Sequence, residues 1–197
     1  KRKSMLSYKE SLKILKETSA LVEGHFILSS GLHSDKYIQC AKLLSKPAQA
    51  KEICLSLAEK IKNNFKKIDL ILSPAIGGIV IGYEIGRILN IETIFAERVN
   101  GLFELRRGFE IKKEKKILIL EDVITTGKSS LECSQLVKKA DAQLLGFATL
   151  IDRSGGKSLI NEKIISQLEM LIPTYNKDNL PKHLQGIKPI KPGSRFL

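Results

Sequence analysis

The chain has 197 residues, 43% of them hydrophobic, which suits one domain with a sizeable core and a small appended subdomain. No apolar run approaches the length of a membrane span, and the basic start at 1–4 is not followed by the apolar segment of a signal peptide, so we expect no membrane partner. The net charge of +12 comes from dispersed lysines without interleaved aromatic residues, which favours a solvated basic surface and a polyanionic ligand over a nucleic-acid interface.

The three cysteines indicate a reducing compartment. Cys40, Cys54 and Cys133 are odd in number, far apart and without the spacing of metal ligands. We therefore expect reduced thiols in the core of a cytoplasmic protein.

The first part of the chain predicts a helix followed by a polar hairpin. Apolar residues at helical spacing predict an amphipathic helix from about Tyr8 to Val22, with Ser7 as its N-cap. From 23 to 39, two strand-like pieces flank the turn Ser29-Ser30-Gly31. This stretch is too polar and too rich in glycine to be core alone.

The next segment predicts a helix, a buried strand and a glycine turn. A helix is expected over 47–65, because Pro47 suits a first helical position. Residues 69–73 form a short apolar run typical of a buried strand. Gly77 and Gly78 follow it and precede a helix over 79–89, so this turn could bind an anion through its backbone amides.

A second strand is expected over 91–96, ending at Glu97 and Arg98. Residues 99–109 then predict a hairpin or a mobile loop that carries Arg106 and Arg107. These arginines could serve a polyanionic ligand, or they could be plain surface charges.

The most informative stretch is 116–130. Its first half is an unbroken apolar run that predicts a buried parallel strand, which stops at Glu121 and Asp122. A turn over 125–128 and a helix from about Ser129 follow. The helix N-terminus, the turn amides and the hydroxyls of this stretch predict a phosphate site. Gly127 would let the phosphate approach the backbone closely.

The two acids of this stretch indicate the rest of the ligand. Carboxylates at a strand end can accept hydrogen bonds from a sugar diol or hold the waters of a bound Mg²⁺. A ribose 5-phosphate satisfies both halves, with its phosphate in the turn and its hydroxyls on Glu121 and Asp122. A Walker A loop is rejected because Asp122 stands where that motif needs glycine. An ordinary strand-to-helix turn with a threonine cap stays open as the simpler alternative.

A last strand is expected over 144–151, followed by Asp152 and Arg153. Open α/β sheets bind ligands at the carboxyl ends of their strands, and the planar fork of an arginine suits a carboxylate. The tail from 172 to 197 contains four prolines and ends in Lys191-Pro192-Gly193-Ser194-Arg195.

These motifs carry a resemblance to a known family. Residues 121–127, Glu-Asp-Val-Ile-Thr-Thr-Gly, resemble the phosphoribosyl diphosphate (PRPP) signature of type I phosphoribosyltransferases. Residues 24–37, with Gly-His-Phe, Ser-Gly, His-Ser and Tyr, resemble the hood segment of orotate phosphoribosyltransferases of the short bacterial and archaeal branch, which also shares the ending of the tail. The resemblance covers nearly the whole chain.

The resemblance implies a doubly wound parallel α/β sheet with a small N-terminal hood, divided into 5–45, a core at 46–172 and a tail at 173–197. It implies transfer of a phosphoribosyl group from PRPP to orotate with Mg²⁺, in a homodimer. The implied catalytic residues are Arg98, Arg107 and Asp122. The implied PRPP-binding residues are Gly77, Gly78, Glu121, Asp122, Val123, Ile124, Thr125, Thr126, Gly127, Lys128 and Ser129. Orotate would bind Thr125, Arg153, Ser30 and Gly31, and Mg²⁺ would arrive with PRPP, near Glu121 and Asp122.

The chain departs from the family pattern at three places. The loop at 99–109 lacks the Lys…Lys…His set of many members, which leaves the general acid open. Gly77 and Gly78 stand without the lysine that many members carry there. Residues 180–183 replace a Cys-Pro-x-Cys motif, so no metal is expected in the tail.

Two other functions stay open from the residues themselves. A phosphoribosyltransferase for a purine base would leave Arg153 without a carboxylate partner. A PRPP-sensing regulator would use the basic surface to bind nucleic acid, although the sequence shows no helix-turn-helix segment for this role.

Overall fold

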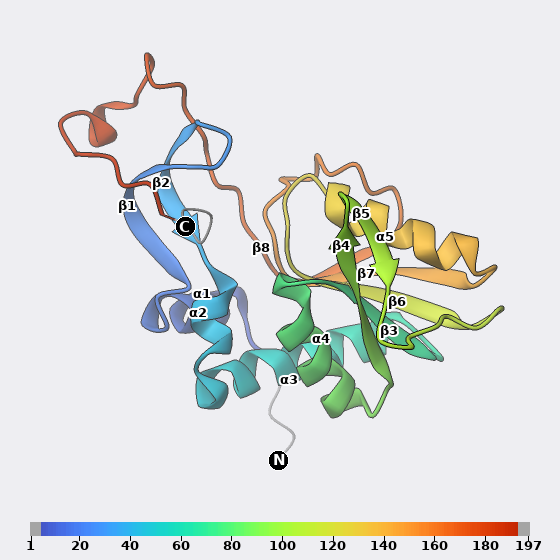
Figure 1. The fold of residues 1–197 in the computed structure, drawn as a ribbon. Helices are drawn as coiled ribbons and strands as arrows, with labels where there is room; N and C mark the ends of the chain where they lie inside the picture. Colours follow the sequence, from blue (N-terminus) through green and yellow to red (C-terminus); the bar gives the residue numbers. More distant parts are fainter. Residues whose placement is uncertain (1–4, 193–197) are drawn as a thin grey trace.

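The computed structural model describes residues 5–192 and shows two lobes (Figure 1). The larger lobe, here called the core, is a six-stranded sheet with helices on both faces. The smaller lobe contains β1 (Leu21–Ile27) and β2 (His33–Ile38), an antiparallel pair that we call the hood together with its connecting turn. Gly193, Ser194 and Arg195, which contribute to the family-like ending, lie outside the described residues.

The core sheet has the strand order β5-β4-β3-β6-β7-β8. Every pairing is parallel except that of β4 with β5, so the expected parallel α/β sheet is confirmed, with one antiparallel edge strand. Strands β4 and β5 are added on one side of β3, whereas β6, β7 and β8 are added on its other side. The boundary between β3 and β6 is therefore the topological switch point, where open α/β sheets bind ligands. The strands are β3 (Leu70–Pro74), β4 (Thr93–Val99), β5 (Leu102–Leu105), β6 (Lys116–Ile124), β7 (Gln143–Asp152) and β8 (Ile164–Glu169).

Two hydrophobic layers hold the sheet. Along β6, Leu118 and Leu120 pack on the side of α3 and α4, whereas Ile117 and Ile119 pack on the side of α5. This alternation is expected for a strand whose two faces are both covered. The helices are α1 (Tyr8–Glu17), α2 (Cys40–Leu44), α3 (Pro47–Asn64), α4 (Gly77–Leu89), α5 (Lys128–Lys139) and a 3₁₀ turn, η1 (Lys182–Leu184). None of the helices within 5–192 is long and apolar enough to cross a membrane.

Several predicted boundaries were wrong. The first helix does not reach Val22: it ends at Glu17, because Thr18 caps it and Ser19 adopts a left-handed φ of 60°, which breaks the helix before β1. Ser7 is the N-cap as predicted, in a capping box with Glu10.

The strands also extend further than the sequence indicated. Strand β4 continues through Glu97 and Arg98, and β6 continues through Glu121 and Asp122 to Ile124. Pairing with β5 and β7 respectively supports these polar ends, although their residue types resemble turn residues. Two further elements, α2 and β8, were not predicted, because α2 is only five residues long and β8 mixes Ser166 and Gln167 with apolar residues.

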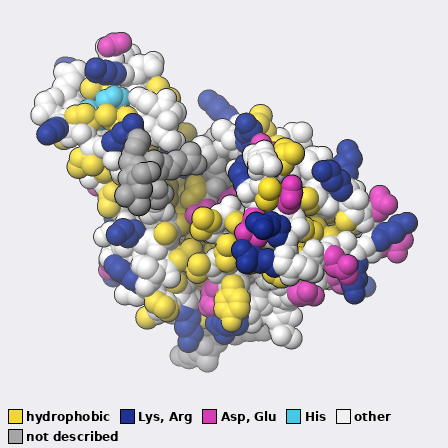
Figure 2. Space-filling view, viewed as in Figure 1, with side chains coloured by type: hydrophobic (Ala, Val, Ile, Leu, Met, Phe, Trp, Pro, Cys, Tyr) yellow, Lys and Arg dark blue, Asp and Glu magenta, His cyan; other side chains and the backbone are white. Residues whose placement is uncertain are grey.

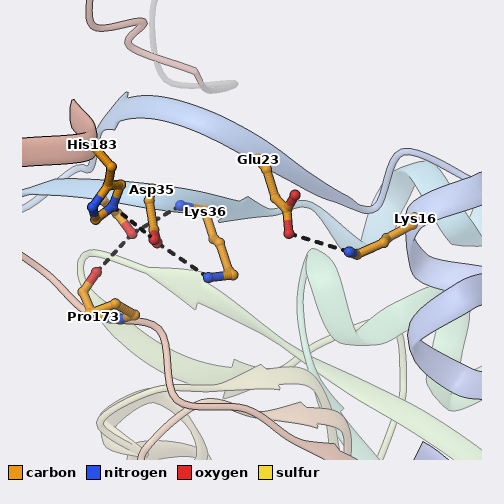
Figure 3. Close-up of polar contacts among 7 residues, drawn as sticks. Lys16, Glu23, Asp35, Lys36, Pro173 and His183 are labelled. Atoms are coloured by element: carbon orange, nitrogen blue, oxygen red, sulfur yellow. Dashed lines mark hydrogen bonds and ion pairs between the residues drawn. The ribbon is translucent and has the colours of Figure 1, made fainter. Parts of the chain in front are cut away.

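The tail returns to the hood and adds backbone pairing to both of its strands. Ile190 pairs with Phe26 and Tyr175 pairs with His33. Side chains reinforce this contact: the Ser34 hydroxyl donates to the Pro173 carbonyl at 2.9 Å, and His183 lies 3.3 Å from Asp35 (Figure 3). Hood and tail therefore form one lobe beside the core (Figures 1 and 2).

Cys40, Cys54 and Cys133 are buried free thiols, as predicted. Burial raises the pKa of all three, which makes them poor nucleophiles in the folded chain.

Candidate active site

The turn between β6 and α5, residues 125–129, has the geometry of an anion site. Gly127 is the N-cap of α5 with a φ of +81°, and a side chain at this position would meet Ile160 at 2.8 Å. The Thr126 hydroxyl accepts a hydrogen bond from the Lys128 amide at 3.3 Å. A hollow of about 220 Å³ lies over the turn, lined by Glu121 and residues 123–130. The sequence prediction of a strand, a turn and a helix start is confirmed here.

The two acids sit in a buried position at the end of β6. Burial, the neighbouring charge of Asp122 and a hydrogen bond between the two side chains raise the pKa of Glu121 to about 9. Burial also raises the pKa of Asp122, although the Val123 amide, which donates to its carboxylate at 2.9 Å, opposes this shift. The pair therefore holds a proton at neutral pH in the free protein. Such a pair is suited to hydroxyl donors or to a nearby cation.

The glycine turn after β3 lies against this acidic pair. A Cβ atom at Gly77 would stand 2.8 and 2.9 Å from the two carboxylate oxygens of Asp122, and one at Gly78 would stand 3.1 Å from the Leu120 carbonyl. Only glycine allows the helix start of α4 to approach Asp122 this closely. The two glycine turns recognised in the sequence thus meet at one place, at the switch point of the sheet.

Arg98 is brought to the 125–129 turn from β4. Its guanidinium donates to the Ser129 hydroxyl at 3.4 Å and to the Gly101 carbonyl at 2.7 Å, and it forms an ion pair with Glu132 on α5. It also lies over the Phe103 ring at 4.2 Å. The arginine is therefore held beside the anion site before any ligand binds.

Arg107 is placed differently, although it lies on the same hairpin segment. Its guanidinium makes two hydrogen bonds to Glu97, at 2.9 and 3.0 Å, and lies 5.7 Å from the Phe95 ring. Its partners are thus on β4 rather than on the 125–129 turn. The sequence did not single out Glu97 or Glu132 as partners of the arginines.

Arg153 lies directly after β7, beside the end of β6. Its amide donates to the Ile124 carbonyl at 2.9 Å, which fixes it next to the turn. The guanidinium is half-buried, and its Nε is buried without a hydrogen-bond partner within residues 5–192. Burial lowers the pKa of Arg153, while Tyr37 from the hood acts in the opposite direction. A half-buried cation with a free donor is suited to an anionic ligand.

Comparison with known proteins decides the family. A sequence model of the family described as phosphoribosyl transferase domain matches residues 41–177. The orotate phosphoribosyltransferase of Caldicellulosiruptor saccharolyticus is 46% identical over 184 residues, covering 93% of this chain and 95% of the relative. That of Parvibaculum lavamentivorans is 46% identical over 189 residues, covering 94% and 97%. The chain belongs to the orotate phosphoribosyltransferase family.

Solved structures agree on the fold of this family member. The orotate phosphoribosyltransferase of Aeropyrum pernix superposes with a TM-score of 0.66 at 20% identity, covering 80% of this chain and 92% of that one. An adenine phosphoribosyltransferase of Thermoanaerobacter pseudethanolicus superposes with a TM-score of 0.58 at 18% identity, covering 68% and 88%. The shared fold therefore does not choose the base, and the choice depends on sequence identity and on the residues of the site.

The hood residues expected to meet the base make local contacts. The Ser30 hydroxyl accepts from the Leu32 amide at 3.4 Å, and the Gly31 amide donates to the Leu28 carbonyl at 2.9 Å. Gly31 has a φ of +83°, which the turn requires. Tyr37, on the neighbouring strand β2, is a hood residue close enough to Arg153 to raise its pKa, and no sequence motif indicated this proximity.

Proposed function

We propose that this chain transfers the 5-phosphoribosyl group of PRPP to orotate, giving orotidine 5′-phosphate and diphosphate in pyrimidine synthesis. The observation that carries the choice of base is the half-buried Arg153 guanidinium, with its unpartnered Nε, beside the 125–129 turn. Orotate carries a carboxylate that such a fork binds well, whereas a purine base has none. Identity of 46% to orotate phosphoribosyltransferases supports the same choice.

The donor would lie across the two glycine turns. The 5-phosphate binds the amides and hydroxyls at 125–129 and the positive end of α5. Glu121 and Asp122 accept hydrogen bonds from the ribose hydroxyls, and the amides of Gly77 and Gly78 hold the diphosphate. The proposed donor set is Gly77, Gly78, Glu121, Asp122, Val123, Ile124, Thr125, Thr126, Gly127, Lys128 and Ser129.

The site also fits Mg²⁺ carried by PRPP. Mg²⁺ prefers oxygen ligands and keeps several waters, and a carboxylate pair beside the donor suits such a hydrated ion. When bound, Mg²⁺ would neutralise the diphosphate as it leaves. Glu121 and Asp122 would lie near the ion and orient its waters.

The chain's own residues would supply positioning and charge. Bond cleavage at the ribose C1 builds positive charge on the sugar, as in glycoside hydrolysis, and negative charge on the diphosphate. The Asp122 carboxylate stabilises the first, and the cations of Arg98 and Arg107 stabilise the second. Arg107 must leave Glu97 to do so, because the two now form a bidentate pair.

The base would be enclosed between the core and the hood. Arg153 binds the orotate carboxylate, Thr125 lies at the adjoining end of the turn, and Ser30 and Gly31 cover the base from the hood. Water exclusion by this cover would strengthen each charge interaction inside.

We also propose a homodimer in the cytoplasm. Three large apolar side chains at helical spacing, Ile76, Val80 and Tyr83, are 85%, 53% and 67% exposed along α4. Hydrophobic side chains gather over this part of the surface in Figure 2. A second copy would cover such a stripe, which begins next to the diphosphate turn. The buried free thiols suit a reducing compartment.

A turnover assay tests the function. The chain is supplied with PRPP, Mg²⁺ and either orotate, uracil, adenine or hypoxanthine, and loss of each base is followed. We expect turnover with orotate alone. Turnover with a purine would favour the purine enzyme, and tight PRPP binding without turnover, together with salt-dependent binding to duplex DNA, would favour a regulator.

A further inference from the structure

One buried side chain next to the site has no assigned role. Thr149 lies on β7, directly opposite Glu121 in the parallel register, and is fully buried. Its hydroxyl donates to the main-chain carbonyl of Asp122 at 2.9 Å, with the Ile151 carbonyl at 3.2 Å as a second acceptor. Thr149 therefore contacts the backbone of the acidic pair from the neighbouring strand.

The orientation of the Asp122 peptide is closely constrained. The Val123 amide donates to the Asp122 carboxylate at 2.9 Å, while the Thr149 hydroxyl holds its carbonyl. On the other side, the carboxylate packs closely against Gly77, where an added Cβ atom would stand 2.8 Å from a carboxylate oxygen of Asp122. A small rotation of this peptide would therefore move the carboxylate against the glycine turn or away from it.

The other side-chain donor to this carbonyl, among the residues at 5–192, is weak. The Cys40 thiol lies 3.9 Å from the Asp122 carbonyl, and a thiol is a poor hydrogen-bond donor. Cys40 thus cannot replace the threonine hydroxyl if that is removed. Without this hydroxyl, the position of the carbonyl would depend on the pairing of β6 with β7 alone, in which the register has no partner for Asp122 between Glu121 and Val123.

We propose that Thr149 is a positioning residue for PRPP binding and phosphoribosyl transfer: it fixes the Asp122 peptide so that the carboxylate faces the ribose hydroxyls and the diphosphate turn. This inference rests on the proposed function. The physical basis is that catalytic groups act from a fixed geometry, and small displacements are costly when the group contributes through orientation.

The competing explanation is that Thr149 only stabilises the sheet. Thr18 provides a matched control, because it is also a buried threonine whose hydroxyl donates to two main-chain carbonyls, those of Ile14 at 2.7 Å and Leu15 at 3.2 Å. It caps α1, outside the proposed site. Thr18→Val therefore removes a similar pair of contacts without touching the acidic pair.

The experiment compares Thr149→Val, Thr149→Ser and Thr18→Val with the wild type. Calorimetry measures PRPP binding with Mg²⁺ and without base, steady-state kinetics measures turnover, and thermal unfolding measures stability. We expect Thr149→Val to weaken PRPP binding about five-fold and to lower kcat by a similar or larger factor, the scale of one lost hydrogen bond. Thr149→Ser should return both to within about two-fold of wild type, and Thr18→Val should lower the melting temperature alone.

A double-mutant cycle separates positioning from general destabilisation. If Thr149 acts through Asp122, Thr149→Val should add little to the loss of PRPP affinity already caused by Asp122→Asn. Additive losses, or PRPP binding and kcat within about two-fold of wild type in Thr149→Val, would overturn the inference. Should the valine variant not fold, Thr149→Cys takes its place in the same cycle. A wild type that binds PRPP but shows no turnover defeats the proposed function, while the cycle on PRPP affinity still decides the role of Thr149.

Discussion

Arg98 and Glu132 form an ion pair that joins the β4–β5 hairpin to the first turns of α5. Glu132 lies three residues after Ser129, on the same face of the helix, so the pair places the arginine within 3.4 Å of the Ser129 hydroxyl. The Arg98 guanidinium, which should bind PRPP, is thus positioned by the Glu132 carboxylate, which also neutralises its charge. Glu132 and the phosphate groups of PRPP would compete for the same cation.

The first prediction follows from this competition. Glu132→Gln should tighten PRPP binding by about two- to five-fold, because a half-exposed ion pair is worth at most about 1 kcal/mol and its loss frees Arg98 for the donor. Calorimetry at two salt concentrations measures the gain, which should shrink at high salt. Glu84→Gln is the matched control, since Glu84 pairs with Arg87 on α4. Weaker PRPP binding in Glu132→Gln would mean that Glu132 orients Arg98 rather than competing for it.

The second prediction concerns the choice of base. Arg153→Ala should raise the orotate KM or lower turnover by about ten-fold or more, because losing one partner of a charge-assisted pair costs about 2–5 kcal/mol at about 1.4 kcal/mol per decade. Thermal stability should hold or rise, since the Nε of this half-buried cation has no partner within residues 5–192.

Two further measurements complete the test of Arg153. Arg153→Lys should recover only part of the loss, because a point charge cannot form the fork. PRPP affinity measured without base should change much less than orotate use. Equal losses of both would make Arg153 a structural or donor residue.

The parts of this site that sequence could predict are those set by local pattern. The apolar run before Glu121, the turn at 125–128 and the helix after it follow from periodicity and turn chemistry, and the position of Arg153 follows from a strand end. The pairing of Arg98 with Glu132 and of Arg107 with Glu97 depends on how β4 lies against α5 and the hairpin, which no local pattern encodes. The extension of β6 through two acids depends on pairing with β7. Tertiary pairing there overrides the turn-like residue types.

The third prediction concerns the stability of the free protein against pH. Glu121 has a pKa of about 9 in the fold, against an ordinary value of 4.5. Between these values the folded chain keeps a proton that the unfolded chain releases, so Glu121 makes stability fall as pH rises from about 4.5 to 9. Glu121→Gln carries no such proton. Its melting temperature should match that of the wild type near pH 5 and exceed it at pH 8.5. The expected difference is about 2–4 °C for each kcal/mol by which the free energy of unfolding of the variant exceeds that of the wild type.

Thermal unfolding across this pH range, without divalent cations or PRPP, measures the difference. Glu121→Gln should at the same time weaken PRPP binding, because an amide accepts hydrogen bonds from the ribose less well than a carboxylate. Melting curves that run parallel in wild type and variant would show that Glu121 is ionised in the free protein.

The fourth prediction concerns the contact between hood and tail. The Nδ1 of His25 lies 2.7 Å from the Ile187 carbonyl, and its Nε2 lies 2.6 Å from Nδ1 of His33. A carbonyl only accepts, so His25 must donate through Nδ1, and its Nε2 then accepts from His33. Both rings are buried. The contacts therefore run from the tail carbonyl through His25 on β1 to His33 on β2.

Breaking this chain of contacts should therefore loosen the tail. Hydrogen exchange of the Ile190 amide, which donates to the His25 carbonyl at 2.8 Å, measures the contact. The Leu184 amide, next to His183, reports separately on the contact between His183 and Asp35 that Figure 3 shows.

A variant of the pair separates the buried histidines from the exposed one. His33→Phe keeps a ring in the hood but removes the donor to His25, so the Ile190 amide should exchange faster than in wild type. His183→Ala should leave the exchange of the Ile190 amide as in wild type. If His33→Phe exchanged at the wild-type rate, the buried pair would not hold the tail. If His183→Ala accelerated exchange of the Ile190 amide, the exposed contact with Asp35 would control the tail instead.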